Sequence, residues 1–133
     1  MDVIILAGGK GTRLQSVISD VPKPMAPING KPFLYYILSS IKGYNISKII
    51  LSIGFKGEII KNYFGEDFLG IPIEYAEELE PLGTGGGIQF ASQFTQDENF
   101  IVMNGDTWFP ISLLELWDFH LTKQSMISIA LKE

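Results

Sequence analysis

Residues 3–14 read VIILAGGKGTRL, in which a branched apolar run passes directly into a glycine-rich loop. The run predicts a buried strand at Val3–Leu6, because short branched apolar runs bounded by turn signals are typical of parallel sheets. Glycines after a strand let main-chain N–H groups approach an anion, and Lys10 and Arg13 add donors suited to phosphate oxygens. The stretch therefore predicts a strand followed by a phosphate-binding loop.

The same alternation of apolar runs and amphipathic segments continues along the chain. We expect further strands at Lys48–Ile53, Ile73–Ala76, Phe100–Met103 and Met126–Leu131, and helices at Pro32–Gly43, Gly57–Phe64, Gly85–Phe94 and Ser112–Lys123. Pro32 suits a first helical turn, Gly43 a stop and Ser112 an N-cap. Strands that alternate with helices predict an α/β fold around a mostly parallel sheet, with residues 1–133 in one domain.

The composition narrows the classes of function. The chain has 133 residues, 46% of them apolar and 19% charged, with a net charge of −5, as in an ordinary folded domain. It has no cysteine and a single histidine, His120, which excludes disulfides and argues against a zinc enzyme. The acidic balance argues against nucleic-acid binding. An acidic start and short apolar runs argue against a signal peptide or membrane span, so we expect a cytoplasmic protein.

A second glycine cluster, Gly83 and Gly85–Gly87, also lies between an expected strand and an expected helix. In a parallel sheet both clusters fall at the carboxyl ends of the strands, where ligands bind. Neither is a familiar nucleotide loop: the Rossmann pattern needs a glycine where Leu14 stands, and the P-loop needs glycine, lysine and then serine or threonine. A dinucleotide-binding protein thus remains only a weaker alternative.

Lys23 lies in the proline-rich stretch VPKPMAP at residues 21–27. Three prolines stiffen this stretch, so a lysine on it near the first loop can face a second phosphate at little ordering cost. The alternative is a rigid surface connector with a solvated lysine.

Asp106 lies in the polar turn NGDT at residues 104–107, directly after an expected strand. A carboxylate at this edge of the sheet suits Mg²⁺, which takes one or two carboxylates together with substrate phosphates. The alternative is an Asx turn that binds only its own backbone.

Taken together, these elements resemble the sugar-1-phosphate nucleotidyltransferases, also called nucleotide-sugar pyrophosphorylases. The resemblance is carried, in family order, by LAGGKGTRL at 6–14, PKPM at 22–25, PLGTGG at 81–86 and NGD at 104–106. It implies a Rossmann-like three-layer sandwich, of which this chain would be the N-terminal, nucleotide-binding part, since relatives continue well beyond Glu133. The remainder would supply most of the sugar pocket and a second metal-binding aspartate, and an exposed sheet edge would favour association into a homo-oligomer.

The resemblance also implies the reaction and its residues. An oxygen of a sugar 1-phosphate would attack the α-phosphorus of a nucleoside triphosphate, and pyrophosphate would leave. Arg13 would neutralise the departing pyrophosphate, Lys23 would contact the phosphates, and Asp106 would hold the Mg²⁺ cofactor. The residues implied in nucleotide binding are Leu6, Gly8, Gly9, Gly11, Thr12, Glu78, Gly83 and Gly85.

Glu78, five residues before Gly83, bears on the identity of the base. Uridylyl and thymidylyl relatives usually have a glutamine at this place, which both donates and accepts, whereas an ionised glutamate only accepts. Guanine presents two adjacent donors, N1–H and the 2-amino group, so Glu78 favours GTP. Glu77 and Glu80 leave room for a different register, and a thymidylyl-, uridylyl- or cytidylyltransferase stays as an alternative.

The chain is similar to bacterial guanylyltransferases that act on heptose 1-phosphate or mannose 1-phosphate, notably at residues 22–27 and 81–87. This narrower resemblance implies a sugar of the manno configuration and a product of the GDP-heptose or GDP-mannose type. A nucleotide-binding module without turnover is the alternative from a different class, and it would bind GTP and Mg²⁺ without releasing pyrophosphate.

Overall fold

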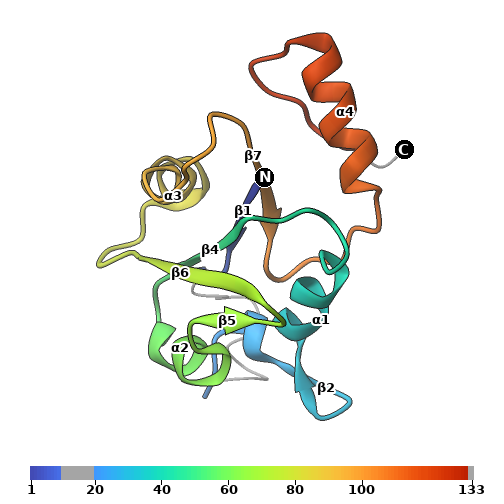
Figure 1. Ribbon diagram of the computed structural model, residues 1–133. Coiled ribbons are helices and arrows are strands. Elements are labelled where there is room, and N and C mark those ends of the chain that lie inside the picture. The colour runs from blue at the N-terminus through green and yellow to red at the C-terminus, as the bar shows by residue number, and fades with distance from the viewer. Residues whose placement is uncertain (10–19, 132–133) are drawn as a thin grey trace.

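A five-stranded sheet forms the centre of the molecule (Figure 1). The computed structural model describes residues 1–9 and 20–131. In the order in which they lie side by side, the strands are β5 (Asp67–Phe68), β6 (Ile71–Glu77), β4 (Lys48–Ile53), β1 (Asp2–Leu6) and β7 (Phe100–Asn104). Three of the four pairings are parallel, and the short β5 runs antiparallel to β6. The prediction of a mostly parallel sheet is confirmed.

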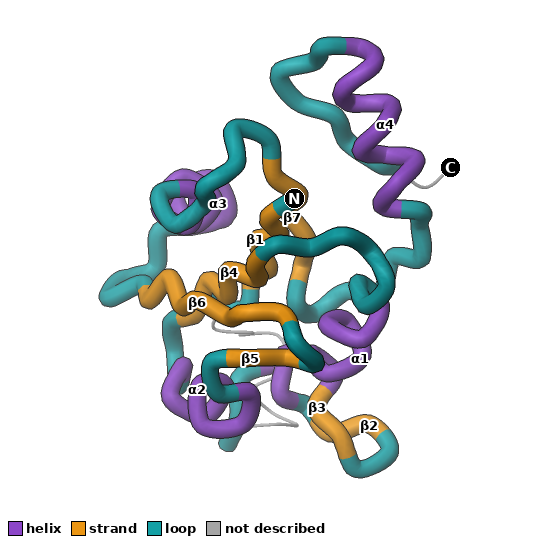
Figure 2. Tube along the Cα trace, viewed as in Figure 1, coloured by secondary structure: helices purple, strands orange, loops and turns teal. Residues whose placement is uncertain are grey.

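Helices cover both faces of this sheet, and alternate residues of its strands supply the two halves of the core. The helices α1 (Phe33–Ser40) and α2 (Gly57–Phe64) pack on the face to which Val3 and Ile5 contribute. The helix α3 (Gly83–Ser92) packs on the opposite face, where Ala91 meets Ile4 and Ile50. Figure 2 shows the strands as one layer between these helices. The three-layer sandwich expected from the resemblance is confirmed.

Element boundaries follow local signals closely. The strand at Lys48–Ile53 and the helix at Gly57–Phe64 have the predicted ends, whereas α3 begins two residues earlier than predicted. The helix α4 (Leu113–Lys123) opens at Ser112, whose hydroxyl accepts a hydrogen bond from the Glu115 N–H at 3.2 Å. That bond satisfies one of the N–H groups that a helix start leaves without a partner, as expected of a serine N-cap.

The strand predicted at Met126–Leu131 is wrong. This segment forms no strand, and Met126 and Leu131 are 98% and 83% exposed. Its apolar residues favour an extended strand, but a strand also has to form main-chain hydrogen bonds with a neighbour, and this segment does not pair with the open edge of β7. The segment instead turns back along α4 (Figure 1), where the Nδ1 atom of His120 lies 3.0 Å from Ser128 Oγ.

A small two-stranded hairpin, β2 (Pro27–Ile28) and β3 (Lys31–Pro32), lies beside the main sheet. It follows a 3₁₀ turn, η1 (Lys23–Met25), in which Pro24 and Met25 are buried. These buried neighbours anchor the turn, so the position of Lys23 is fixed by packing. Within the described ranges, no helix is long and apolar enough to cross a membrane.

Candidate functional site

The carboxyl ends of four strands converge on one cavity of about 300 Å³. Main-chain hydrogen bonds continue past the strand ends and fix the segments that follow them. The Ala7 N–H donates to the Ser52 carbonyl at 2.7 Å, the Glu78 N–H to the Ile53 carbonyl at 2.8 Å, and the Gly105 N–H to the Leu6 carbonyl at 2.9 Å. The residues just beyond each strand therefore occupy defined places around the cavity.

Most of the predicted site residues that the structure describes line this cavity: Leu6, Gly8, Gly9, Lys23, Glu78, Gly83 and Asp106. Gly85 does not line the cavity. It is exposed on α3, and a Cβ atom there would meet open space. Gly11, Thr12 and Arg13 lie outside the described residues. The fold thus brings together residues separated by up to a hundred positions in the chain.

At one end of the cavity, Lys23 and Asp106 form an ion pair. The Lys23 Nζ atom donates to Asp106 Oδ2 at 2.7 Å, and the Thr107 hydroxyl donates to Asp106 Oδ1 at 3.0 Å. Partial burial acts to raise the pKa of Asp106, but the bonds from Lys23 and Thr107 outweigh it and leave that pKa below its ordinary value of 3.8. A lysine and an ionised carboxylate therefore face the same space, and each can take a new partner.

At the other end, the Glu78 carboxylate is held at both oxygens. The Ser52 hydroxyl donates to Oε1 at 2.7 Å, and the Leu82 N–H donates to Oε2 at 3.2 Å. Leu82 is the N-cap of α3, so the carboxylate also lies at the positive end of that helix. These two hydrogen bonds fix the orientation of the Glu78 carboxylate in the cavity wall. An ionised carboxylate can only accept hydrogen bonds from a ligand.

Two glycines make room for this carboxylate. A Cβ atom on Gly87 would lie 2.8 Å from Glu78 Oε1, and one on Gly8 would lie 3.4 Å from the same atom and 3.2 Å from the Gly54 nitrogen. Any side chain at Gly87 would displace the carboxylate. The glycines of both clusters therefore serve close packing at the cavity wall, in addition to any role toward an anion.

Ser52 was not among the predicted site residues, and Gly87 was named only as a member of the second glycine cluster. Ser52 was detectable as the one hydroxyl in the buried run KIILSI, at the carboxyl end of its strand. Gly87 follows Gly83 by one helical turn, which places both on the same face of α3. Neither signal reveals which carboxylate the two residues contact.

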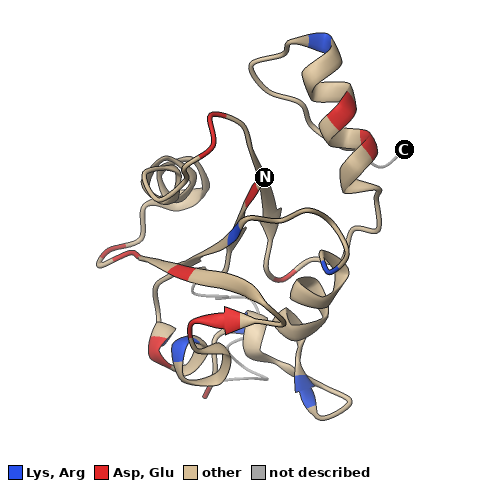
Figure 3. Ribbon diagram, in the orientation of Figure 1, with Lys and Arg blue, Asp and Glu red and all other residues tan. Residues whose placement is uncertain are grey.

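The two ends of the cavity differ in charge. Acidic residues mark the loop that joins β6 to α3 (Figure 3), and this loop carries Glu78. Lys23 lies at the other end, paired with Asp106 in the turn that follows β7. Three strand spacings separate β6 from β7, or about 14 Å at about 4.8 Å each, with Gly8 and Gly9 between them. A ligand with hydrogen-bond donors at one end and phosphates at the other fits this arrangement.

A metal ion in this cavity would depend on Asp106. Across residues 1–9 and 20–131, no group of three or more acidic or histidine side chains could hold a metal by itself. Mg²⁺, however, commonly takes one or two carboxylates and completes its coordination with substrate phosphates and water. The single Asp106 carboxylate therefore fits a magnesium ion that arrives with a phosphate ligand.

Comparison with known proteins assigns the family. A family model described as nucleotidyl transferase matches residues 2–133, and the chain belongs to this family. It is 48% identical over 132 residues to the D-glycero-alpha-D-manno-heptose 1-phosphate guanylyltransferase of Aneurinibacillus thermoaerophilus, covering 99% of this chain and 57% of that relative. It is 50% identical over 133 residues to the enzyme of the same name from Campylobacter jejuni, covering 100% of this chain and 58% of that relative.

A solved structure of similar fold matches most of this chain. The crystal structure of HddC from Yersinia pseudotuberculosis complexed with GMP-PN superposes with a TM-score of 0.81 at 41% identity, over 90% of this chain and 54% of that one. The chain thus spans little more than half the length of the relatives it matches.

Proposed function

We propose that this chain forms the nucleotide-binding part of a sugar-1-phosphate guanylyltransferase, which transfers GMP from GTP to a sugar 1-phosphate and releases pyrophosphate. The observation that carries the proposal is the Glu78 carboxylate, held at both oxygens in the cavity wall. Each oxygen keeps one lone pair for a ligand, and guanine offers two adjacent donors for them. Uracil, thymine and cytosine offer no such pair.

At the phosphate end, the residues act by positioning and by charge. Lys23 would exchange its carboxylate partner for a phosphate oxygen, while the main chain at Gly8 and Gly9 lies beside the path of the triphosphate. Gly11, Thr12 and Arg13 would complete this loop, with Arg13 at the departing pyrophosphate. A Mg²⁺ ion bound to Asp106 would neutralise charge on the triphosphate.

The transfer needs no covalent enzyme intermediate. An oxygen of the sugar phosphate forms a bond to the α-phosphorus, the bond from that phosphorus to the α–β bridging oxygen breaks, and the bond electrons leave with pyrophosphate. Holding both reactants in line and neutralising the leaving group are sufficient sources of catalysis for phosphoryl chemistry. The names of the two bacterial relatives favour a heptose 1-phosphate as the acceptor, with mannose 1-phosphate as the related choice.

A calorimetric titration with GTP, CTP, UTP and dTTP in the presence of Mg²⁺ tests the base preference. We expect GTP to bind most tightly, and Glu78→Gln to reduce its advantage over UTP by about 10- to 100-fold, because a charge-assisted pair of hydrogen bonds is lost. Glu80→Gln is the matched control, since it makes the same change two residues away. Equal binding of all four nucleotides, or an equal effect of both substitutions, would contradict the assignment of Glu78.

Pyrophosphate release distinguishes an enzyme from a module that only binds. The assay combines the chain with GTP, Mg²⁺ and either heptose 1-phosphate or mannose 1-phosphate. Release that depends on the sugar phosphate supports transfer, whereas GTP binding without release favours the nucleotide-binding module.

A further inference from the structure

Ser52 is a polar residue in the most apolar part of the fold. It lies on β4, where Ile49 to Ile53 are all buried, and only 1% of its surface is exposed. Because side chains alternate along a strand, Ser52 faces the same side of the sheet as Ile50, toward α3. A buried hydroxyl without a hydrogen-bond partner destabilises the fold. The group that Ser52 binds therefore indicates its role.

That partner is the Glu78 carboxylate. The Ser52 hydroxyl on β4 donates to Oε1 at 2.7 Å. The N–H of Leu82, the N-cap of α3, donates to Oε2 at 3.2 Å. The position that a Cβ atom of Gly87 would take lies 3.7 Å from Ser52 Oγ and 2.8 Å from Oε1. The carboxylate is therefore bordered by a strand hydroxyl, a helix terminus and a glycine, while it still lines the cavity.

We infer that Ser52 is a positioning residue for base selection: its hydroxyl holds the Glu78 carboxylate in the orientation that accepts two hydrogen bonds from a guanine edge. This inference rests on the proposed role of Glu78. A glutamate side chain has three rotatable bonds, and one that is already immobilised loses less conformational freedom when a ligand binds. Ser52 thus acts on the ligand through Glu78 and need not contact it.

The test measures binding of GTP, ITP and UTP to the full chain carrying Ser52→Ala. We expect the affinity for GTP to fall about tenfold, the loss that follows when one flexible side chain must be ordered on binding. ITP lacks the 2-amino group and keeps only one donor to Glu78, so its affinity should fall less. UTP should bind nearly as before, because its base cannot donate to both oxygens.

Two further variants separate positioning from general packing. Ser52→Thr keeps the hydroxyl and suits a strand, so it should restore most of the GTP preference. Ser39→Ala removes a half-buried hydroxyl whose hydrogen bond goes to the Tyr35 carbonyl on α1, away from the cavity, and should leave all three affinities unchanged.

The outcomes separate this inference from the function on which it rests. A loss confined to GTP and, more weakly, ITP, with rescue by threonine, supports it. An unchanged preference in Ser52→Ala, or an equal loss for all three nucleotides, overturns it and leaves the guanylyl proposal in place. A native chain without any preference for GTP overturns the proposed function, and this inference with it.

Discussion

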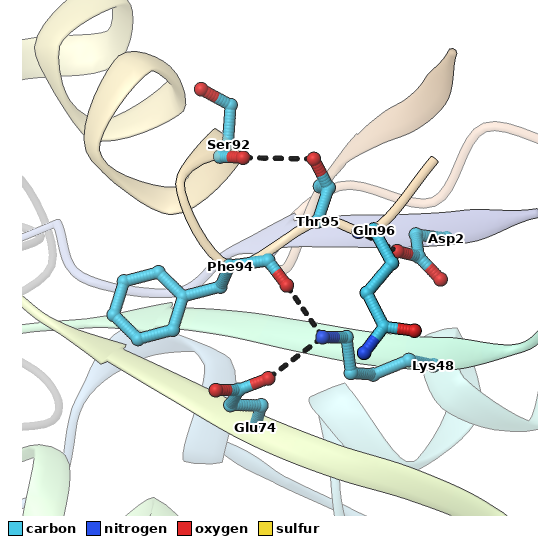
Figure 4. Close-up of polar contacts among 7 residues, drawn as sticks. All are labelled: Asp2, Lys48, Glu74, Ser92, Phe94, Thr95 and Gln96. Carbon is cyan, nitrogen blue, oxygen red and sulfur yellow. Dashed lines mark hydrogen bonds and ion pairs between the residues drawn. The ribbon is translucent and has the colours of Figure 1, made fainter. Parts of the chain in front are cut away.

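The two ends of the central sheet carry similar charged groups in different settings. At the amino ends of the strands, Lys48 Nζ lies 2.8 Å from Glu74 Oε2 and also donates to the Phe94 carbonyl, while buried Asp2 accepts from the Gln96 N–H (Figure 4). At the carboxyl ends, Lys23 and Asp106 pair at 2.7 Å. The two lysine–carboxylate bonds have nearly the same length.

Their surroundings differ more than their geometry. The Lys48 side chain is 15% exposed and that of Glu74 46%, and Lys48 links the chain that leaves α3 to β4 and β6. The Lys23 and Asp106 side chains are 36% and 34% exposed and line a cavity. The first pair links main-chain segments, whereas the second borders the free space in which we propose that a phosphate and a cation bind. The presence of free space beside a pair, and not its length, distinguishes a binding role from a structural one.

The largest effect should come from Gly87→Ala at the carboxyl end. Its Cβ would lie 2.8 Å from Glu78 Oε1, so the carboxylate must move from its place in the wall. We expect GTP affinity to fall about 10- to 100-fold, because a displaced carboxylate loses its charge-assisted hydrogen bonds to the base, worth about 1.5–3 kcal/mol. Calorimetry checks this, with Gln89→Ala on the exposed side of α3 as the control. Full retention of GTP binding in Gly87→Ala would show that the carboxylate does not need this position.

Lys48→Met should affect stability and leave nucleotide binding unchanged. It removes a charged donor from the Phe94 carbonyl and from Glu74, a loss of about 1.5–2 kcal/mol in the free energy of unfolding. Urea denaturation measures it. The control is Lys61→Met, which breaks the more exposed pair with Glu77 and should cost less than about 1 kcal/mol. If Lys48→Met weakened GTP binding specifically, the two ends of the sheet would not differ as described.

Lys23→Met should weaken nucleotide binding and leave stability nearly unchanged, the opposite of Lys48→Met. The phosphates of GTP lose a charge-assisted donor, so affinity should fall about tenfold. The free energy of unfolding should change by less than about 1 kcal/mol, because the pair with Asp106 is partly exposed and screened by solvent. Calorimetry and urea denaturation on the same protein give both values. A large loss of stability with intact GTP binding would make Lys23 a structural residue.

The smallest effect concerns pH. Because the folded-state pKa of Asp106 lies below 3.8, its contribution to stability is present above that pH and is lost as the pH falls through the lower, folded-state value. The difference in stability between the native chain and Asp106→Asn should therefore be constant from pH 7 to about pH 5 and shrink below about pH 3.8. Thermal unfolding across this range measures it, and a difference that grew in acid would have the wrong sign.

Much of the fold could be predicted because local signals and tertiary packing agree. The first strand and the helix opened by Ser112 have the features that their sequences favour. The hairpin at Asn29-Gly30 was missed, although this pair is a strong hairpin signal and both residues have positive φ values of 49° and 79°. Met126–Leu131 was predicted wrongly because strand propensity is local, whereas a strand also has to pair with a neighbour, and this segment does not pair with the open edge of β7.

The site was predictable in part. Motifs placed Lys23 and Asp106 at the cavity, but their mutual ion pair is a contact across 83 positions that no spacing rule reveals. Glu78 was identified from its place in the sequence, five residues before Gly83. Its hydrogen bond from Ser52 depends on how β4 pairs with β6. A continuous motif in the sequence predicts which residues belong to the site. The orientation of their side chains follows only from contacts in the folded structure.

A crystal structure of this chain with GTP and Mg²⁺ would test the proposed roles of Glu78, Ser52 and Lys23 together. We expect the guanine edge at Glu78, with N1 and the 2-amino nitrogen within hydrogen-bond distance of the two carboxylate oxygens and Ser52 still donating to Oε1. We also expect Lys23 to bind a phosphate oxygen instead of Asp106. A base bound away from Glu78, or a triphosphate that leaves the Lys23–Asp106 pair intact, would contradict these roles.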